Sequence, residues 1–320
     1  MTKLRVFRYD PEKNGGKSWY QTWDLDIAKG KTVLDILHEV HYFHDPTLSF
    51  RRSCNSAICG SCGMRLNKQA RLACNTQALD LAEEYGEVLV EPLGNLRPLK
   101  DLVVDMGPFW QSVLDVRPFL IHHGKEPEGL YPVTKAQMDL TRIARDCIFC
   151  GACLSDCTSR EANPAFLGPA ALAKAYKFVG DPRDDATEGR LAVYSEPNGI
   201  WDCDTCLYCN EVCPMGVKPM DAILMMREMA LEHGLVRAQG ARHALAFYDT
   251  VMKSGKVNEA MTAMKSLGRR FVTDAGTVGI TLRTVLKGKA PNPFKRPIRG
   301  IQDIRKLQAS LEQSRRRSRA

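Results

Sequence analysis

The chain has 320 residues and a net charge of +8; 44% of the residues are hydrophobic and 26% are charged. This ordinary globular composition excludes wholesale disorder and a collagen-like fibre, and the length indicates more than one domain. No uncharged stretch approaches the length of a membrane-spanning helix, and the first residues are charged (Lys3, Arg5, Arg8) without the apolar segment of a secretory signal. We therefore expect a cytoplasmic protein.

The first hundred residues predict a small β-rich domain. Two β-type runs and a glycine-containing turn within residues 4–27 are typical of a hairpin. A helix is expected from Thr32, because Thr32 and Asp35 have the spacing of a capping pair. A last strand is expected at 87–91. The order strand, strand, helix, cysteine-bearing loop, strand is that of a β-grasp domain, so we predict an α+β chain that places this domain at residues 1–105.

The rest of the chain is predicted to be helical. Prolines and a glycine between 92 and 117 indicate a linker, and helix-length segments beside two further groups of cysteines predict a helical domain at 106–235. Residues 236–320 contain no cysteine and are predicted to form a helical extension, with a glycine-containing stretch after residue 267. The extension ends in a basic tail: residues 295–320 carry a net charge of +7, which leaves the other 294 residues nearly neutral.

Twelve cysteines are too many to be incidental in a reducing compartment, where disulfides are disfavoured. They fall into three groups of four. The first group has the spacing C-x4-C-x2-C-x11-C, which is the plant-type pattern for a 2Fe–2S cluster. Thiolates are soft ligands that suit iron, and the glycines of the loop let the backbone wrap closely. The predicted ligands are Cys54, Cys59, Cys62 and Cys74.

The second and third groups share the spacing C-x2-C-x2-C-x3-C. This is the bacterial ferredoxin pattern, in which three cysteines hold one cluster and the fourth binds the other. We therefore predict one 4Fe–4S cluster and one further cubane-type cluster. A structural zinc site is the alternative for each group, although zinc sites usually come as paired two-cysteine knuckles. The predicted ligand sets are Cys147, Cys150, Cys153 and Cys213 for the first, and Cys157, Cys203, Cys206 and Cys209 for the second.

The sequence contains neither the G-x-G-x-x-G pattern of dinucleotide-binding proteins nor a phosphate-binding P-loop. We therefore expect no flavin or nicotinamide on this chain and no catalytic residue. Three clusters without machinery for a substrate predict a chain that moves single electrons.

Segments 49–54, 59–64 and 72–74, followed by the two ferredoxin patterns, resemble the iron-sulfur subunit of succinate dehydrogenase and fumarate reductase. The resemblance covers residues 1–235. It implies a subunit of such a complex that does not itself bind succinate, with a flavoprotein (FAD) subunit as partner. It further implies that the flavin exchanges electrons with the 2Fe–2S cluster, that the helical domain passes them onward, and that the complex lies on the inner face of the cytoplasmic membrane.

The sequence departs from the commoner pattern of this family in two respects. Most members lack the second cysteine of the third group and carry a 3Fe–4S cluster, whereas this chain has Cys206. We therefore expect a 4Fe–4S cluster there, with 3Fe–4S as the alternative if Cys206 is not a ligand. The residues of the usual quinone pocket are replaced by Thr158, Ala162 and Asp204, so we expect quinone to be reached only indirectly.

Segment 247–259 resembles the small subunit of heterodisulfide reductases, whose partner carries cysteine-rich CCG motifs. This implies a CCG-motif subunit as a second partner, with a membrane-anchor subunit as the alternative. Two other functions are kept as alternatives: the iron-sulfur subunit of a thiol-coupled fumarate reductase or heterodisulfide-reductase-like oxidoreductase, and a zinc-stapled nucleic-acid binder that uses the basic tail. We favour the electron carrier and expect no nucleic-acid partner.

Overall fold

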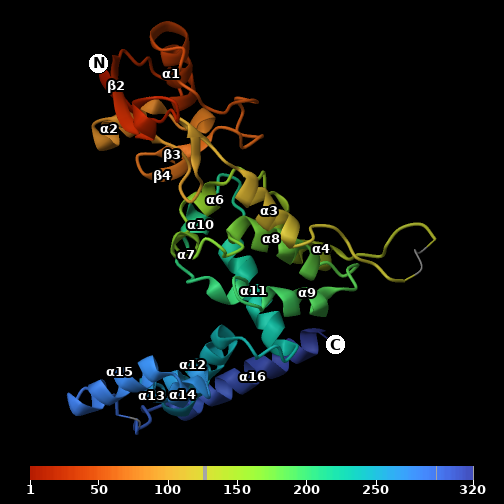
Figure 1. Cartoon of the computed structure of the whole chain (residues 1–320). Coiled ribbons are helices and arrows are strands. Elements are labelled where there is room, and N and C mark those ends of the chain that lie inside the picture. Colours follow the sequence, from red (N-terminus) through yellow and green to blue (C-terminus); the bar gives the residue numbers. More distant parts are fainter. Residues whose placement is uncertain (125–127, 293, 320) are drawn as a thin grey trace. The chain divides into compact units, whose positions relative to one another are not determined.

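The computed structural model describes residues 1–124, 128–292 and 294–319. The chain forms two compact units, Met1–Met229 and Ala230–Ala320 (Figure 1). The predicted domain boundaries at 105 and 235 stay a prediction. Among the helices that are described, none has both the length and the low charge needed to cross a lipid bilayer.

The first unit begins with a five-stranded mixed sheet in the order β2-β1-β5-β3-β4. The first strand pairs antiparallel with the second and parallel with the last, so the chain must cross over before it returns to the middle of the sheet. Together with the helices that follow, this sheet confirms the predicted α+β class. The strands are β1 Thr2–Arg8, β2 Trp19–Leu25, β3 Gly63–Leu66, β4 Gln69–Leu72 and β5 Val88–Glu91.

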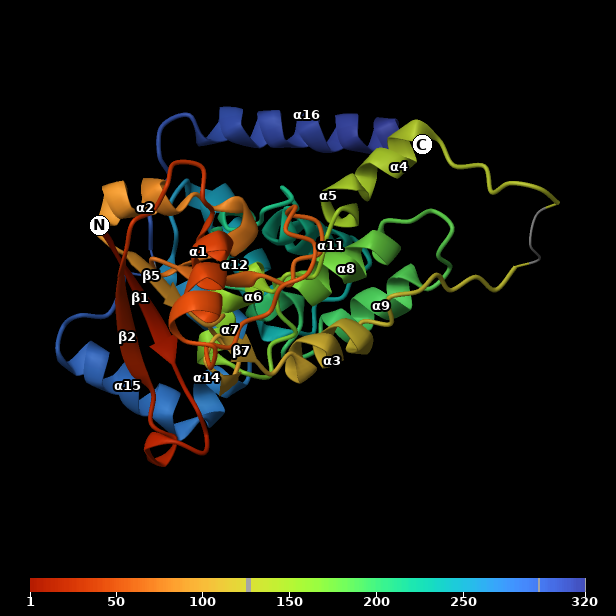
Figure 2. The same ribbon diagram turned by 90° about the horizontal axis from the view of Figure 1, so that it is seen from above.

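Two helices accompany the sheet, α1 Val33–Glu39 and α2 Ala78–Tyr85. The predicted cap is present, since the Thr32 hydroxyl accepts from the backbone N–H of Asp35 while the Asp35 carboxylate accepts from that of Thr32. Figure 2 shows α1 beside β1 and β2. Apolar side chains of the strands and of α1 form the core of this part: Leu4, Val6, Val33, Leu34, Ile36, Leu37, Val88 and Val90 are all buried.

The predicted linker between 92 and 117 was wrong, because this stretch carries regular structure: β6 Pro98–Lys100, β7 Val103–Val104 and α3 Gly107–Asp115. Pro108 stands in the first turn of α3. A proline costs little there, since the backbone N–H at that position has no partner inside the helix. The residues that suggested a break therefore begin a helix.

The rest of the first unit is helical, as predicted. The helix-length segment before the second cysteine group is divided at Thr141 into two short helices. The most buried helix is α8, in which ten of the eleven residues are buried. The helices are α4 Lys135–Leu140, α5 Arg142–Arg145, α6 Ala152–Ser155, α7 Thr158–Ala162, α8 Pro169–Val179, α9 Thr187–Tyr194, α10 Tyr208–Glu211 and α11 Pro219–Glu232.

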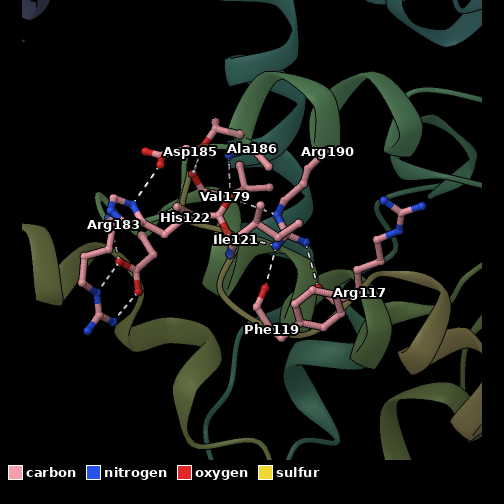
Figure 3. A network of polar contacts seen from close by, with 12 residues as sticks. Arg117, Phe119, Ile121, His122, Val179, Arg183, Asp185, Ala186 and Arg190 are labelled. Carbon is pink, nitrogen blue, oxygen red and sulfur yellow. Dashed lines mark hydrogen bonds and ion pairs between the residues drawn. The ribbon is translucent and has the colours of Figure 1, made fainter. Parts of the chain in front are cut away.

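A buried ion pair joins the segment after α3 to the helical part (Figure 3). The Arg190 guanidinium donates to both carboxylate oxygens of Asp184, at 3.1 and 2.9 Å. It also donates to the backbone carbonyls of Arg117 and Phe119, at 2.8 and 2.6 Å. The side chains of Arg190 and Asp184 are only 4% and 0% exposed. All three nitrogens of this buried guanidinium therefore donate hydrogen bonds within the fold.

The second unit consists of α12 Gln239–Ser254, α13 Glu259–Leu267, α14 Arg270–Thr273, α15 Ala275–Leu286 and α16 Ile301–Arg319. The glycine-containing stretch expected after residue 267 therefore contains two helices. Arg305 of α16 donates to the carbonyls of Met252 and Lys253, at 2.8 and 2.7 Å. A cation here bonds to the terminal carbonyls of α12 and interacts favourably with the negative end of the helix dipole.

We expect Asp184→Ala to lower the midpoint of thermal unfolding by about 10 °C, because it leaves the Arg190 charge buried without its partner. The measurement is the loss of far-ultraviolet circular dichroism on heating. Glu188→Ala, an exposed carboxylate of α9, is the control and should shift the midpoint little. Equal midpoints for both variants would contradict the importance of the ion pair.

Candidate iron–sulfur cluster sites

The loop that carries Cys54, Cys59 and Cys62 is folded by left-handed backbone positions. Asn55, Ala57 and Gly60 have φ values of 53°, 58° and 73°. Such angles disfavour most side chains and are used where a chain must curl tightly. The curl turns the backbone N–H groups of the loop inward, toward the thiols.

Six backbone N–H groups point at sulfur atoms of this site, at 3.3–3.5 Å. Three reach the Cys54 Sγ, one reaches the Cys74 Sγ and two reach the Cys59 Sγ. Thiolates are better acceptors than thiols, and N–H groups aimed at ligand sulfurs are a feature of iron–sulfur sites. The loop therefore fits a 2Fe–2S cluster. The donors are Ser56, Ile58 and Cys59 for the Cys54 Sγ, Ala57 for the Cys74 Sγ, and Cys54 and Ser61 for the Cys59 Sγ.

Two glycines of this loop lie against the backbone of Cys150, which belongs to the second cysteine group. A Cβ on Gly60 would lie 2.9 Å from the Cα of Cys150, and a Cβ on Gly63 would lie 2.7 Å from its carbonyl oxygen. Real Cβ atoms almost never come this close to backbone. Only glycine lets the first and second sites approach in this way.

The second site is a cavity lined by Cys147, Cys150, Cys153 and Cys213. The first three follow one another in the chain, whereas Cys213 comes from the third group, as the crossing prediction requires. Burial raises the pKa of the Cys150 thiol to about 11, and the nearby thiols of Cys213 and Cys147 add to this. Cluster binding must therefore displace protons from these thiols.

The third site brings Cys157 beside the remaining cysteines of the third group. Burial raises the pKa of the Cys209 thiol to about 12, and the neighbouring thiols of Cys203, Cys157 and Cys206 raise it further. The Thr158 hydroxyl contacts the Cys206 Sγ at 3.6 Å. The end of the second cysteine group thus lies against the third, and Cys206 is the exposed member of the set.

The described part of the chain contains no group of three or more His, Cys, Asp or Glu side chains close enough to hold a single metal ion. The cysteines nevertheless converge in the three sets described above. This combination is expected where thiols surround a cluster, whose ligands stand farther apart than those of one ion.

Two cations, the buried Lys174 and the half-buried Arg227, accompany the second and third sites, and sequence reasoning missed both. The Lys174 ammonium lies 4.8 Å from the ring centroid of Phe149. Phe149 is in the short stretch between Cys147 and Cys150. The Arg227 guanidinium donates to the carbonyl of Cys203 at 2.5 Å. A positive charge near a cluster stabilises its reduced state. Nothing in the sequence singles these two residues out, because each helix carries other charged side chains as well.

Comparison with known families agrees with this reading of the sites. Residues 3–111 match the 2Fe-2S iron-sulfur cluster binding domain family, and residues 143–217 match the 4Fe-4S dicluster domain family. The predicted 2Fe–2S and 4Fe–4S cofactors are therefore confirmed as classes. The alternative of a zinc-stapled nucleic-acid binder is not supported by either match.

Curated relatives identify the larger family. The 8-methylmenaquinol:fumarate reductase iron-sulfur subunit of Wolinella succinogenes is 32% identical over 320 residues, which covers 95% of this chain and 97% of the relative. The fumarate reductase iron-sulfur subunit of Mycobacterium tuberculosis is 36% identical, with coverage of 72% and 94%. That of Haemophilus influenzae is also 36% identical, with coverage of 69% and 89%.

A solved structure agrees: a chain of the Mycobacterium smegmatis Sdh1 complex in the apo form superposes with a TM-score of 0.65 at 27% identity, with coverage of 73% of this chain and 97% of that one. The chain belongs to the iron-sulfur subunits of the fumarate reductase and succinate dehydrogenase family. The predicted role, electron transfer as one subunit of an oxidoreductase complex, is confirmed.

We expect Gly63→Ala to push the loop of the first site away from Cys150 and to lower the thermal midpoint by roughly 3–10 °C, because the new methyl group meets backbone. Electron paramagnetic resonance should show a weaker magnetic interaction between the reduced first and second sites. Gly189→Ala is the matched control, since its Cβ would face open space. An unchanged interaction in Gly63→Ala would show that the glycine does not set the approach.

Proposed function

We propose that this chain carries electrons between a flavoprotein subunit and a CCG-motif subunit of a succinate dehydrogenase or fumarate reductase complex. The observation that carries the proposal is that the twelve cysteines come together in three sets of four. The loop of the first set is in backbone contact with the second set. When bound, iron–sulfur clusters accept and release single electrons. The protein contributes the order of the sites and their close approach.

The proposed ligands are those of the three sets. The first set, Cys54, Cys59, Cys62 and Cys74, holds a 2Fe–2S cluster, and Cys147, Cys150, Cys153 and Cys213 hold a 4Fe–4S cluster. The third set, Cys157, Cys203, Cys206 and Cys209, holds a second 4Fe–4S cluster. The support for the third assignment is that Cys206 lies beside Thr158, the residue after Cys157. The adjacency of the last two sites is supported by Cys153, whose pKa is raised by burial and by thiols that include Cys209.

The flavoprotein is proposed to dock beside the first site. Ile58, inside the cysteine loop, is 68% exposed, and Tyr42 and Phe43 are 59% and 80% exposed. Arg52, two residues before Cys54, donates to the Tyr42 hydroxyl at 3.2 Å and so links the start of the cysteine loop to Tyr42. Exposed aromatic and aliphatic side chains around a redox site are typical of a docking surface.

Electron exchange with the second partner is proposed to take place at the third site. Cys206 is exposed, and the adjacent Leu207 and Tyr208 are 47% and 50% exposed. Thr158 donates a 2.5 Å hydrogen bond to the Asp204 carboxylate, so this surface combines a polar pair with two apolar side chains. This mixture of polar and apolar side chains is more typical of a surface that binds a protein than of a closed apolar quinone pocket.

The extension supports a second protein partner. Coverage of 95% means that the Wolinella relative shares most of residues 236–320, whereas the two relatives with 72% and 69% coverage do not share all of them. The relative that shares the extension is named for a menaquinol. We propose that quinol electrons reach this chain through the CCG-motif subunit, at the inner face of the cytoplasmic membrane. Assay of the purified complex with thiols in place of quinol tests the thiol-coupled alternative.

The crossed ligands make a specific prediction. We expect Cys213→Ala to remove or alter the cluster at Cys147, Cys150 and Cys153, while Cys157→Ala alters the cluster of the third site, because each fourth ligand comes from the opposite group. Iron analysis with electron paramagnetic resonance distinguishes the two outcomes, and each variant serves as the control for the other. Disturbance of its own group by each substitution would contradict the crossing.

Deletion of 236–320 tests the partner. We expect the truncated chain to retain the flavoprotein and succinate-dependent reduction of an artificial acceptor, but to lose the CCG-motif subunit on purification. Removal of only 315–320 is the control for the basic end. Full retention of every partner, or a haem-bearing membrane anchor as the partner, would contradict this part of the proposal.

A further inference from the structure

Helix α15 is an apolar helix that the second unit leaves uncovered. It has twelve residues, none of them buried, and Arg283 is its one charged side chain. Val278, Leu282 and Leu286 recur every four residues along one face and are 42%, 57% and 78% exposed. Helices with so little charge are normally buried in a core or in lipid. The exposed face therefore needs an occupant outside the part of the chain that the structure describes.

The surroundings of this face are basic. Between residues 268 and 292 the sequence has five basic side chains and one acidic one, Asp274. Asp274 accepts from the N–H and the hydroxyl of Thr277, so it is engaged as the cap of α15. The basic residues are all exposed, and none of them forms an ion pair with a residue that the structure describes; they are Arg269, Arg270, Arg283, Lys287 and Lys289.

The length of α15 fixes how it can meet a membrane. Twelve residues rise about 18 Å, which is much less than the roughly 30 Å of a bilayer core. A short apolar helix with flanking Lys and Arg suits the interface, where the apolar face enters the acyl boundary and the cations meet acidic headgroups.

We propose that α14 and α15 bind the chain directly to an anionic lipid surface. Val272 of α14, 71% exposed, extends the apolar contact. The basic residues next to the helix supply the attraction to acidic headgroups. This binding does not depend on the identity of the redox partner. It places the second unit at the membrane.

The charge pattern favours lipid over a protein partner. A protein interface is depleted in charge at its centre and pairs the charges of its rim with the partner's. Here unpaired charges of one sign flank an apolar helix that bears no polar side chain on the face of Val278, Leu282 and Leu286. That arrangement matches an anionic lipid surface, where many acidic headgroups meet many cations.

The test is flotation of the purified full-length chain with vesicles of phosphatidylglycerol and phosphatidylcholine, compared with phosphatidylcholine alone. We expect binding to the anionic vesicles that falls as salt is raised. Leu282→Glu with Leu286→Glu should weaken it at least about tenfold, since two apolar anchors are lost. Leu114→Glu with Val193→Glu is the matched control: these residues are 62% and 64% exposed in the first unit.

A charge variant completes the test. Arg283→Gln, Lys287→Gln and Lys289→Gln together should weaken binding to anionic vesicles, whereas Lys3→Gln, Lys29→Gln and Lys100→Gln remove as many exposed charges from the first unit and should not. Equal binding by the paired variants would overturn the proposal, as would absence of vesicle binding by the full chain. Release of a protein subunit from the complex by Leu282→Glu with Leu286→Glu would also overturn it, because a protein would then cover the face.

Discussion

The contact between the first cysteine loop and the backbone of Cys150 governs the arrangement of this protein. Gly60 and Gly63 have no side chain, so the loop packs directly on the chain that lines the second site. Electron transfer between cofactors depends steeply on distance, and the contact keeps the first two sites adjacent. An alanine at either position would need the two loops to separate.

Hydrogen bonds from β4 and from the residues after β5 reinforce this contact. The N–H of Gly94 donates to the Ser155 hydroxyl, and the Asn95 amide donates to the carbonyls of Leu154 and Cys157. The N–H of Ala70 in β4 donates to the Asp156 carboxylate at 2.8 Å. The short segment between Cys153 and Cys157 is thus held both by β4 and by the residues that follow β5. These hydrogen bonds therefore fix the chain between a ligand of the second site, Cys153, and a ligand of the third, Cys157.

Cysteine spacing predicted the three sets because a cluster demands several thiolates at fixed intervals, and few other constraints produce that pattern. It could not reveal β3 and β4, since each strand has only four residues, Gly63 has low strand propensity and the pairing with β5 is a long-range contact. The linker prediction failed because Pro108 can begin a helix as readily as end one. Lys174 and Arg227 were missed because they are far from the cysteines in sequence, and only the fold brings them beside these residues.

The two units divide the chemistry between them. All twelve cysteines lie in the first, whereas the basic tail and the uncovered helix α15 lie in the second. The most direct test of the account is a crystal structure of the complex with anomalous scattering measured at the iron edge. The account predicts three separate iron clusters, with Cys213 bound to the second and both Cys157 and Cys206 bound to the third. Zinc at any site, or Cys157 or Cys213 bound within its own group, would contradict it.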